Sequence, residues 1–189
     1  MSKLTMPVSA RDHAQGPEDA PITLVEYGDY ECPYCGEAYP IVKRLQKKMG
    51  KDLRFIFRNF PLTESHPHAL AAARAAEAAA LQAKFWEMHD LLYENQATLE
   101  VGNLKTFAQT LELDIAQWAH AFTSAEEITA RLEEDWNSGV RSGVNGTPTF
   151  YINGERHDDS YAYPVLLAAL QRPSARAPQR RRKTPYGGK

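Results

Sequence analysis

The sequence is poor in cysteine and lacks any long apolar run. It has two cysteines among 189 residues, and a chain of this length buries enough apolar surface to fold without disulfides. No stretch approaches the roughly 20 apolar residues that cross a bilayer, and the N-terminal residues lack the apolar core of a secretory signal. We therefore expect a soluble, cytoplasmic protein without membrane contact, whose cysteines serve catalysis or metal binding.

Acidic residues are absent from the C-terminal residues 172–189, which hold seven of the 22 basic residues. Subtracting them leaves 15 basic against 24 acidic residues in the rest of the chain. A segment of proline, glycine and arginine has little apolar surface to bury, so we expect a disordered tail. A solvated extension is more typical of this composition than a nucleic-acid-binding segment, and nucleic acid is not an expected partner.

The first half of the chain predicts a strand, a helix and a second strand. Residues 22–27 are β-branched and aromatic, and residues 53–60 repeat that character. Between them, apolar residues recur at helical spacing from Pro33 until Gly50, a typical C-cap, and Pro40 is expected to kink this helix. The order indicates a right-handed βαβ unit.

Residues 63–140 have high helix propensity and no strand pattern. The expected helix starts are marked by Pro67, by Asn103 and Asp114 as N-caps, and by Ser124 with Glu127 as a capping box for a helix that ends at Gly139. Strand character returns at 148–155, where Asn153-Gly154 signals a hairpin, and a helix is expected over 163–170.

This order predicts an α/β fold: a mixed sheet with helices on its faces and an inserted all-helical subdomain. We expect a polar leader over 1–20, a sheet domain built from 21–62 and 141–171, the helical insertion over 63–140, and the basic tail over 172–189.

Both cysteines lie in the stretch Cys32-Pro33-Tyr34-Cys35. A cysteine just before a helix has its sulfur beside unpaired N–H groups and the positive end of the helix dipole, which favours the thiolate. Pro33 suits the first helical turn, and Cys35 lies one turn along, within disulfide distance. The spacing predicts an exposed nucleophile at Cys32 and a buried resolving thiol at Cys35.

Two other interpretations of the cysteines remain open. A metal site would need histidine or carboxylate ligands, and His66 and His68 are the closest-spaced histidines. Two inert core thiols are the other interpretation. Surface or capping roles are more typical of His66 and His68 than a place beside the active site, and Phe85, Trp86, Trp118 and Trp136 are expected in the subdomain core.

A second motif is Thr147-Pro148, which opens the strand at 148–155. A proline cannot donate a hydrogen bond to a neighbouring strand. If the Thr147-Pro148 bond is cis, the backbone of Thr147 can pair with an extended substrate while Pro148 packs near the sulfurs. The sequence alone leaves the isomer open.

Taken together, the C-P-Y-C motif between strand and helix, the helical insertion with F-W-E-M-H-D-L-L-Y-E-N-Q, and G-T-P-T-F resemble the DsbA-like branch of the thioredoxin superfamily over residues 20–171. The resemblance implies a thioredoxin-like fold and thiol-disulfide oxidoreductase activity. It implies that Cys32 is the nucleophile, Cys35 the resolving cysteine and Pro148 the cis-proline, with Thr147 facing the substrate. Glu26 matches the acidic residue that lies under the cysteines and assists proton transfer.

The chain also departs from that family. The secreted members have a signal peptide and usually Pro-His between the cysteines, whereas this chain has Tyr34 in place of the histidine. We therefore expect a less strongly oxidising pair. The expected substrates are protein or small-molecule disulfides and dithiols, with glutathione or a thioredoxin-type electron donor as partner and no metal or organic cofactor. The alternatives are a glutathione-linked transferase or isomerase of the kappa type, and a metal-binding or interaction module.

Overall fold

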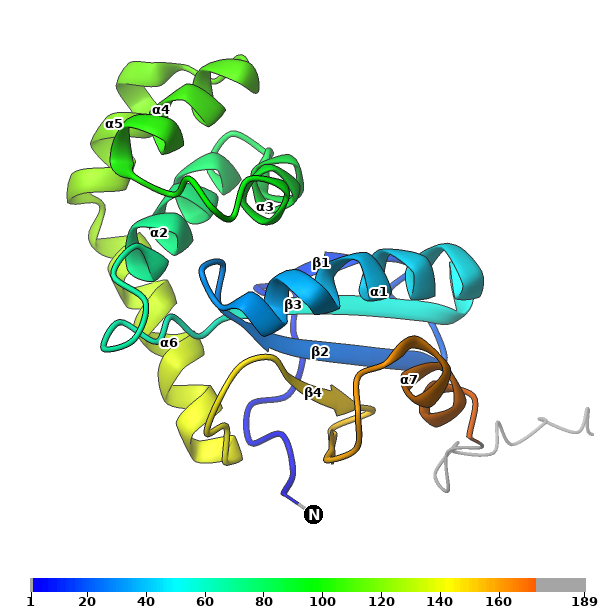
Figure 1. The fold of residues 1–189 in the computed structure, drawn as a ribbon. Helices are drawn as coiled ribbons and strands as arrows, with labels where there is room; N and C mark the ends of the chain where they lie inside the picture. The colour runs from blue at the N-terminus through cyan, green and yellow to red at the C-terminus, as the bar shows by residue number, and fades with distance from the viewer. Residues whose placement is uncertain (1, 173–189) are drawn as a thin grey trace, which may run out of the picture.

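The computed structural model describes residues 2–172 and contains one five-stranded mixed sheet, in the order β1-β3-β2-β4-β5 (Figure 1). The strands are β1 (His13–Gln15), β2 (Ile22–Gly28), β3 (Leu53–Asn59), β4 (Thr149–Ile152) and β5 (Glu155–His157). The pair β2 and β3 is parallel, and every other neighbouring pair is antiparallel. The thioredoxin-like α/β fold expected from the sequence is confirmed.

Residues 2–172 also contain seven α-helices. They are α1 (Pro33–Met49), α2 (Ala69–Ala80), α3 (Phe85–Glu94), α4 (Val101–Thr110), α5 (Ile115–Ser124), α6 (Glu126–Ser142) and α7 (Tyr163–Leu170). Five of them, α2 to α6, follow one another between β3 and β4 and form the helical block beside the sheet in Figure 1. A short 3-10 turn, η1 (Gly50–Asp52), follows α1, which continues through Pro40.

Alternation along the strands divides the core into two clusters, one on each face of the sheet. On one face, α1, α7 and helices α2 to α5 pack over residues that include Leu24, Phe55, Phe57, Phe150, Leu45 and Leu166. On the opposite face lie Val25, Tyr27, Ile56, Phe60, Val144 and Tyr151, and the C-terminal part of α6 packs there against Tyr27 and Phe60. Glu26 alternates with Val25 and Tyr27, so its carboxyl group lies on the α1 face.

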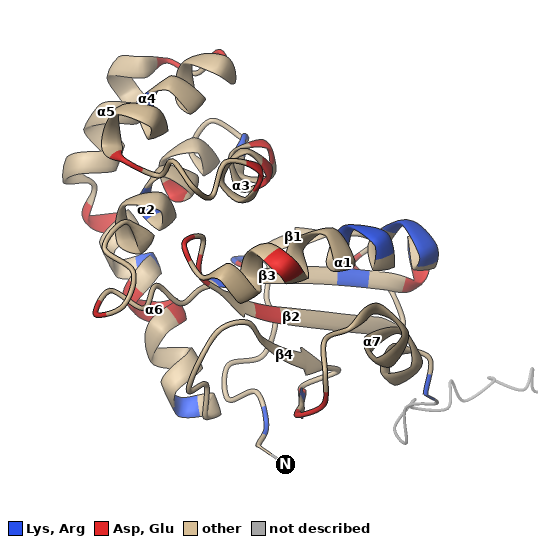
Figure 2. Ribbon diagram, in the orientation of Figure 1, with Lys and Arg blue, Asp and Glu red and all other residues tan. Residues whose placement is uncertain are grey.

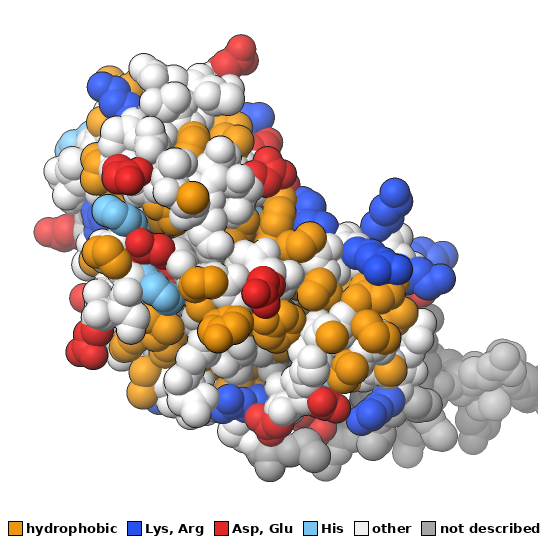
Figure 3. Space-filling model, in the orientation of Figure 1, with side chains coloured by type: hydrophobic (Ala, Val, Ile, Leu, Met, Phe, Trp, Pro, Cys, Tyr) orange, Lys and Arg blue, Asp and Glu red, His pale blue; other side chains and the backbone are white. Residues whose placement is uncertain are grey.

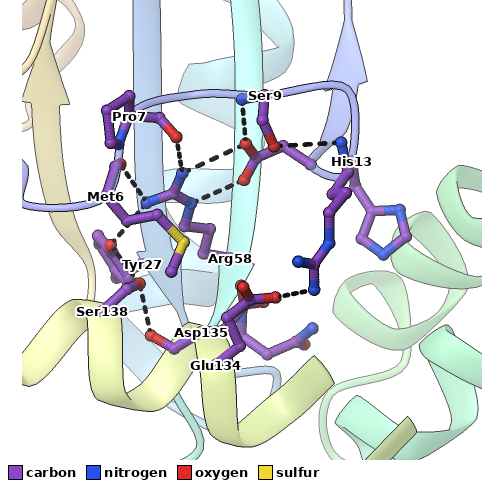
Figure 4. Close-up of polar contacts among 12 residues, drawn as sticks. Met6, Pro7, Ser9, His13, Tyr27, Arg58, Glu134, Asp135 and Ser138 are labelled. Atoms are coloured by element: carbon purple, nitrogen blue, oxygen red, sulfur yellow. Dashed lines mark hydrogen bonds and ion pairs between the residues drawn. The ribbon is translucent and has the colours of Figure 1, made fainter. Parts of the chain in front are cut away.

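The N-terminal residues, expected to be a polar leader, contain β1 and are anchored by a fully buried arginine. Arg58 donates to both carboxylate oxygens of Asp12, at 2.8 and 3.2 Å, and to the carbonyls of Met6 and Pro7 (Figure 4). It also donates to the Tyr27 hydroxyl at 2.9 Å. Strand β1 leaves no strand signal in the sequence, because it has only three residues and none of them is strongly β-forming.

Three predicted helix boundaries are wrong. α2 begins at Ala69 rather than at Pro67, and the helical run breaks between α2 and α3, where Ala83 has a φ of 58°. α4 begins at Val101, so Asn103 lies inside it. Ser124 is the last residue of α5 and caps nothing, since the N-cap of α6 is Ala125.

The predicted end of the last block helix at Gly139 is also wrong, because α6 continues to Ser142. A Cβ at Gly139 would lie 2.7 Å from the ring of Phe60, so this glycine lets α6 pack tightly on the sheet. By contrast, the Asp114 N-cap is confirmed, since its carboxylate accepts from the Gln117 N–H.

The hairpin at Asn153-Gly154 is confirmed, because both residues have positive φ between β4 and β5. Phe85 and Trp118 are buried as expected, whereas Trp136 is 37% exposed and stacks on Phe60 with ring centroids 4.1 Å apart. Within residues 2–172, no helix combines the length and apolarity needed to cross a bilayer. Apart from its first residue, the expected tail lies outside the described residues.

Candidate active site

The C-terminal end of β2 and the first turn of α1 hold the two cysteines, both as free thiols. Cys32 is the N-cap residue of α1, Pro33 follows in the first turn, and Cys35 lies within the helix. Cys35 is fully buried, as expected. Cys32 is only 3% exposed, so the expectation of an exposed nucleophile is wrong. The backbone of Thr147 lies against it, with the carbonyl oxygen 3.3 Å from Cys32 Sγ.

The surroundings of Cys32 favour its thiolate. The first turn of α1 has no acidic residue that would neutralise the positive end of the helix dipole beside Cys32, and the basic residues Lys47 and Lys48 lie in the last turn, at the opposite end (Figure 2). The hydrogen bond from the Cys35 thiol, followed by contributions from the Thr147 side chain and from the backbone N–H groups of Cys35 and Tyr34, outweighs burial and lowers the pKa of Cys32 to about 5. At neutral pH this cysteine is therefore ionised.

Cys35 has the opposite environment. Burial raises the pKa of the Cys35 thiol well above its ordinary value, and its hydrogen bond to Cys32 favours the protonated form further. One group acts against this: the backbone N–H of Asp29 donates to Cys35 Sγ at 3.5 Å. The pair is thus set as one thiolate and one thiol that must lose a proton before it can react.

Glu26 lies in the middle of β2, between Phe57 on β3 and Phe150 on β4, and only 3% of it is exposed. Burial, followed by the negative charge of Cys32, raises the pKa of Glu26 to about 8. The carboxyl group is therefore largely protonated at neutral pH. A carboxylate on a solvent-facing strand would not have this environment.

The remaining predicted site residues border the cysteines. Pro33 is exposed and Tyr34 is 61% exposed, so both are accessible to a partner. Thr147 is buried, with 9% of it exposed, and the Thr147–Pro148 peptide bond, left open by the sequence, is cis. Apolar side chains also gather on the surface over α1 and α7 (Figure 3).

The helical block contributes a residue that the sequence analysis did not single out. Gln96, just after α3, donates its side-chain amide to the carbonyl oxygens of Tyr30, at 2.9 Å, and Cys32, at 2.7 Å. A Cβ at Gly36 would lie 2.2 Å from Gln96 Oε1, so this glycine leaves room for the amide. In the sequence, the glycine directly after Cys35 is the feature that indicates close packing of another segment on the start of α1.

Two histidines have places that the sequence did not predict. His89 is fully buried in a cluster of aromatic rings, and its Nδ1 lies 3.1 Å from the Tyr30 hydroxyl. Burial lowers the pKa of His89 well below its ordinary value, so the ring is neutral. His66, expected at the surface or at a cap, instead contacts the buried Asp29 beside the cysteines, with Nδ1 2.7 Å from Oδ2.

No group of three or more histidine, cysteine or carboxylate side chains in residues 2–172 is arranged to hold a metal ion. The cysteines instead contact each other and the Thr147 backbone. The arrangement is suited to thiol–disulfide exchange, which requires one activated thiolate with a second thiol in reach.

Comparison with known proteins gives a consistent result for the fold. A family model described as Thioredoxin matches residues 9–172. A thioredoxin-like oxidoreductase from Silicibacter pomeroyi is 27% identical, with a TM-score of 0.78 over 87% of this chain and 92% of that one. BdbD from Bacillus subtilis is 25% identical, with a TM-score of 0.75 over 89% and 96% of the two chains.

Sequence relatives among curated proteins are much longer. A protein named Na(+)/H(+) antiporter NhaA 1, from Salinispora arenicola, is 45% identical over 168 residues, which is 88% of this chain and 26% of that protein. One named Na(+)/H(+) antiporter NhaA, from Herminiimonas arsenicoxydans, is 41% identical over 85% of this chain and 25% of its own length. The chain thus spans about a quarter of these relatives, whose names describe the whole proteins.

Proposed function

Because the chain belongs to the thioredoxin family, we propose that it is a thiol–disulfide oxidoreductase that acts on protein or small-molecule thiols through Cys32 and Cys35. The observation that carries this proposal is the opposed ionisation of the two sulfurs at the start of α1, with the pKa of Cys32 lowered and that of Cys35 raised. A solved structure supports the same class, since the similar protein from Silicibacter pomeroyi is described as a thioredoxin-like oxidoreductase.

In the first step, the Cys32 thiolate attacks a sulfur of a substrate disulfide. The substrate S–S bond breaks, a mixed disulfide forms, and the leaving thiolate takes a proton. Cys35 then loses its proton and attacks Cys32 Sγ, which releases the second substrate thiol and leaves the Cys32–Cys35 disulfide. Run in reverse, the same steps oxidise a substrate dithiol and return both enzyme thiols.

Glu26 is our candidate for the group that accepts the Cys35 proton. The thiolate of Cys32 is one of the two causes that raise the pKa of Glu26. Formation of the mixed disulfide removes that negative charge, so the pKa of Glu26 falls and its carboxylate form becomes more populated. The base is thereby produced at the step that needs it, when Cys35 must become a thiolate.

The backbone of Thr147 is our candidate for the substrate-binding edge. Its carbonyl lies 3.3 Å from Cys32 Sγ, so an extended substrate whose cysteine reaches Cys32 would lie alongside it. Pro33, Tyr34 and Pro148 would border the same segment. The apolar surface over α1 and α7 favours polypeptide substrates over small thiols (Figure 3).

Serine variants of the two cysteines test the roles. Cys35→Ser should accumulate mixed disulfides at Cys32 when mixed with a disulfide-containing peptide, because the resolving thiol is missing. Cys32→Ser should form none and should be inactive. Mass spectrometry of the trapped species and turnover with glutathione disulfide as oxidant measure both effects. Equal residual activity in the two variants would contradict the assignment, and glutathione conjugation that survives Cys35→Ser would favour a kappa-type transferase instead.

The direction of electron flow depends on the reduction potential. About 30 mV is a tenfold change in the equilibrium constant of a two-electron couple. Equilibration of the protein with glutathione buffers measures this potential. A value near that of thioredoxin would favour reductase activity, and one well above the cytosolic range would favour oxidase or isomerase activity. The cytoplasmic location and a thioredoxin-type donor stay predictions.

A further inference from the structure

The carboxylate of Asp29 is buried three residues before the nucleophile. Only 1% of Asp29 is exposed, and its oxygens accept hydrogen bonds from three directions. The Glu31 N–H donates to Oδ1 at 2.8 Å, while the Leu62 N–H and His66 Nδ1 reach Oδ2 at 2.8 and 2.7 Å. A buried carboxylate needs such compensation, and of these three donors His66 is the one that can carry a positive charge.

Asp29 also contacts the resolving thiol through its backbone. The Asp29 N–H donates to Cys35 Sγ at 3.5 Å, and this donor stabilises negative charge as Cys35 ionises. The hydrogen bonds to the side chain of Asp29 fix the orientation of the same residue. His66 lies in the segment between β3 and α2, and it therefore acts on the two sulfurs indirectly, through Asp29.

The titratable groups that face His66 belong to the segment before α1: Asp29, Glu31 and Cys32. Burial lowers the pKa of His66, but Asp29 and then the charges of Cys32 and Glu31 outweigh it, and the net shift is upward. Coupling between two charges is reciprocal, so an imidazolium at His66 that is stabilised by the Cys32 thiolate stabilises that thiolate equally. With a side chain 18% exposed, His66 can still exchange protons with solvent.

We propose that His66 is a positioning residue for the dithiol: as an imidazolium it neutralises Asp29, holds the Asp29 N–H toward Cys35 and stabilises the reduced, ionised form of the pair. This inference rests on the proposed oxidoreductase function. The proposal changes the expectation of a less strongly oxidising pair. Tyr34 cannot supply a positive charge within the motif, but His66, 34 residues after Cys32, can supply it. The pair should therefore be more oxidising than C-P-Y-C alone suggests.

Two substitutions separate the charge of His66 from its hydrogen bond. His66→Asn keeps an N–H donor near Asp29 but carries no charge, whereas His66→Ala loses both. His68→Asn is the matched control, because His68 contacts Glu31 through its backbone N–H, at 2.5 Å, and that group survives the substitution. Thermal unfolding shows whether each variant is folded. If His66→Ala does not fold, His66→Asn alone tests the proposal.

The first measurement is the equilibrium between the protein disulfide with two glutathione molecules and the protein dithiol with glutathione disulfide. At pH 6, where the His66 ring is protonated, both His66 variants should shift this equilibrium three- to tenfold toward the protein disulfide. The difference between His66→Asn and the wild type should shrink as the pH rises through the pKa of the ring, because only the protonated ring carries the charge that asparagine lacks. His68→Asn should match the wild type at every pH. A wild-type equilibrium for His66→Asn at pH 6, or an equal shift in His68→Asn, would overturn the proposal.

The second measurement is an NMR titration of the His66 ring in the two redox states. The ring should titrate at higher pH in the reduced protein, because the Cys32 thiolate is present only there, and in Cys32→Ser, which lacks that thiolate, the ring should titrate as it does in the oxidised wild type. Identical titration in both states would overturn the proposal. Either negative result would leave the trapping by Cys35→Ser untouched, so failure of this inference is distinguishable from failure of the proposed function.

Discussion

The sheet with α1 and α7 and the helical block α2 to α6 contribute to the site in different ways. The sheet part carries both sulfurs, Glu26 and Thr147, all of which lie in short sequence motifs. The helical block and the segment leading into it carry no sulfur, yet they supply Gln96 and His66. The reacting groups thus come from one part, and much of the polar support around them comes from the other.

The chemistry of the cysteine pair is therefore not a property of the C-P-Y-C motif alone. Gln96 fixes the carbonyls of Tyr30 and Cys32 at the start of α1, and the segment after β3 surrounds the carboxylate of Asp29. A thiolate at a helix start is sensitive to such neighbours, because a single hydrogen bond or nearby charge shifts a pKa by a unit or more. The insertion therefore contributes to the candidate active site.

The largest expected effect is on the stability of the sheet part. Asp12→Ala leaves the guanidinium of Arg58 buried without its carboxylate, which should lower the free energy of unfolding by about 3–5 kcal/mol. Burial opposes ionisation of Asp12, but hydrogen bonds from Arg58 and the Ser9 backbone hold its pKa below the ordinary value. This stabilisation is present above the ordinary pKa and is lost as the pH falls through the lowered one. Urea unfolding at neutral and acidic pH measures both effects.

Asp19→Ala is the control for this change, because Asp19 is an exposed acid of the same N-terminal segment. It should alter the stability by less than about 0.5 kcal/mol. Arg58 lies on the face of the sheet opposite Glu26, so the glutathione equilibrium of folded Asp12→Ala should match the wild type. A loss below about 1 kcal/mol would show that the N-terminal segment is dispensable for the sheet.

The next effect concerns the pKa of Cys32. Its largest cause is the hydrogen bond from Cys35, and a hydrogen bond to a charged group contributes about 1.5–3 kcal/mol, or roughly one to two pKa units. Cys35→Ala should raise the pKa of Cys32 by that amount, whereas Cys35→Ser keeps a donor and should raise it less. Thiolate absorbance against pH measures both. A value that stays near 5 in Cys35→Ala would mean that α1 and the helical block set the ionisation.

Sequence periodicity was sufficient for the sheet part except for the short edge strand β1. The strands β2 and β3, helix α1 and the hairpin at Asn153-Gly154 lie within about a residue of their predicted places, because local patterns of apolar residues and turn residues determine them. The all-helical character of the insertion was also predictable. Its internal boundaries were not, because Ala83 adopts a positive φ and Gly139 packs on Phe60, and both depend on tertiary contacts.

The site divides in the same way. Cys32, Cys35, Glu26 and Thr147 could be named from motifs, whereas the contact of His66 with Asp29 spans 37 residues and leaves no local pattern. The burial of Cys32 was also unpredictable, since the backbone that covers it is 115 residues away. Long-range contacts of this kind depend on how loops meet after the sheet has formed, and one sequence carries no periodic signal for them.

The smallest expected effect tests the contact between the two parts directly. Gln96→Ala removes two hydrogen bonds, but the Cys32 carbonyl also accepts from the N–H groups of Cys35 and Gly36, so the loss should be about 1–2 kcal/mol. Gly36→Ala should displace the same amide, because the new Cβ would lie 2.2 Å from Gln96 Oε1. Alanine also favours the helix by about 0.5–1 kcal/mol, which partly offsets that loss.

The double variant distinguishes this contact from two unrelated effects. Once Gln96 is shortened, the Cβ at position 36 meets no amide, so Gly36→Ala in the Gln96→Ala background should stabilise the protein by about 0.5–1 kcal/mol. Gly36→Ala should therefore destabilise the wild type but stabilise the Gln96→Ala protein. Urea unfolding of the four proteins in reduced form detects this reversal as a coupling energy. Additive losses would mean that Gln96 and Gly36 act independently, and the helical block would then stabilise the fold without holding the start of α1.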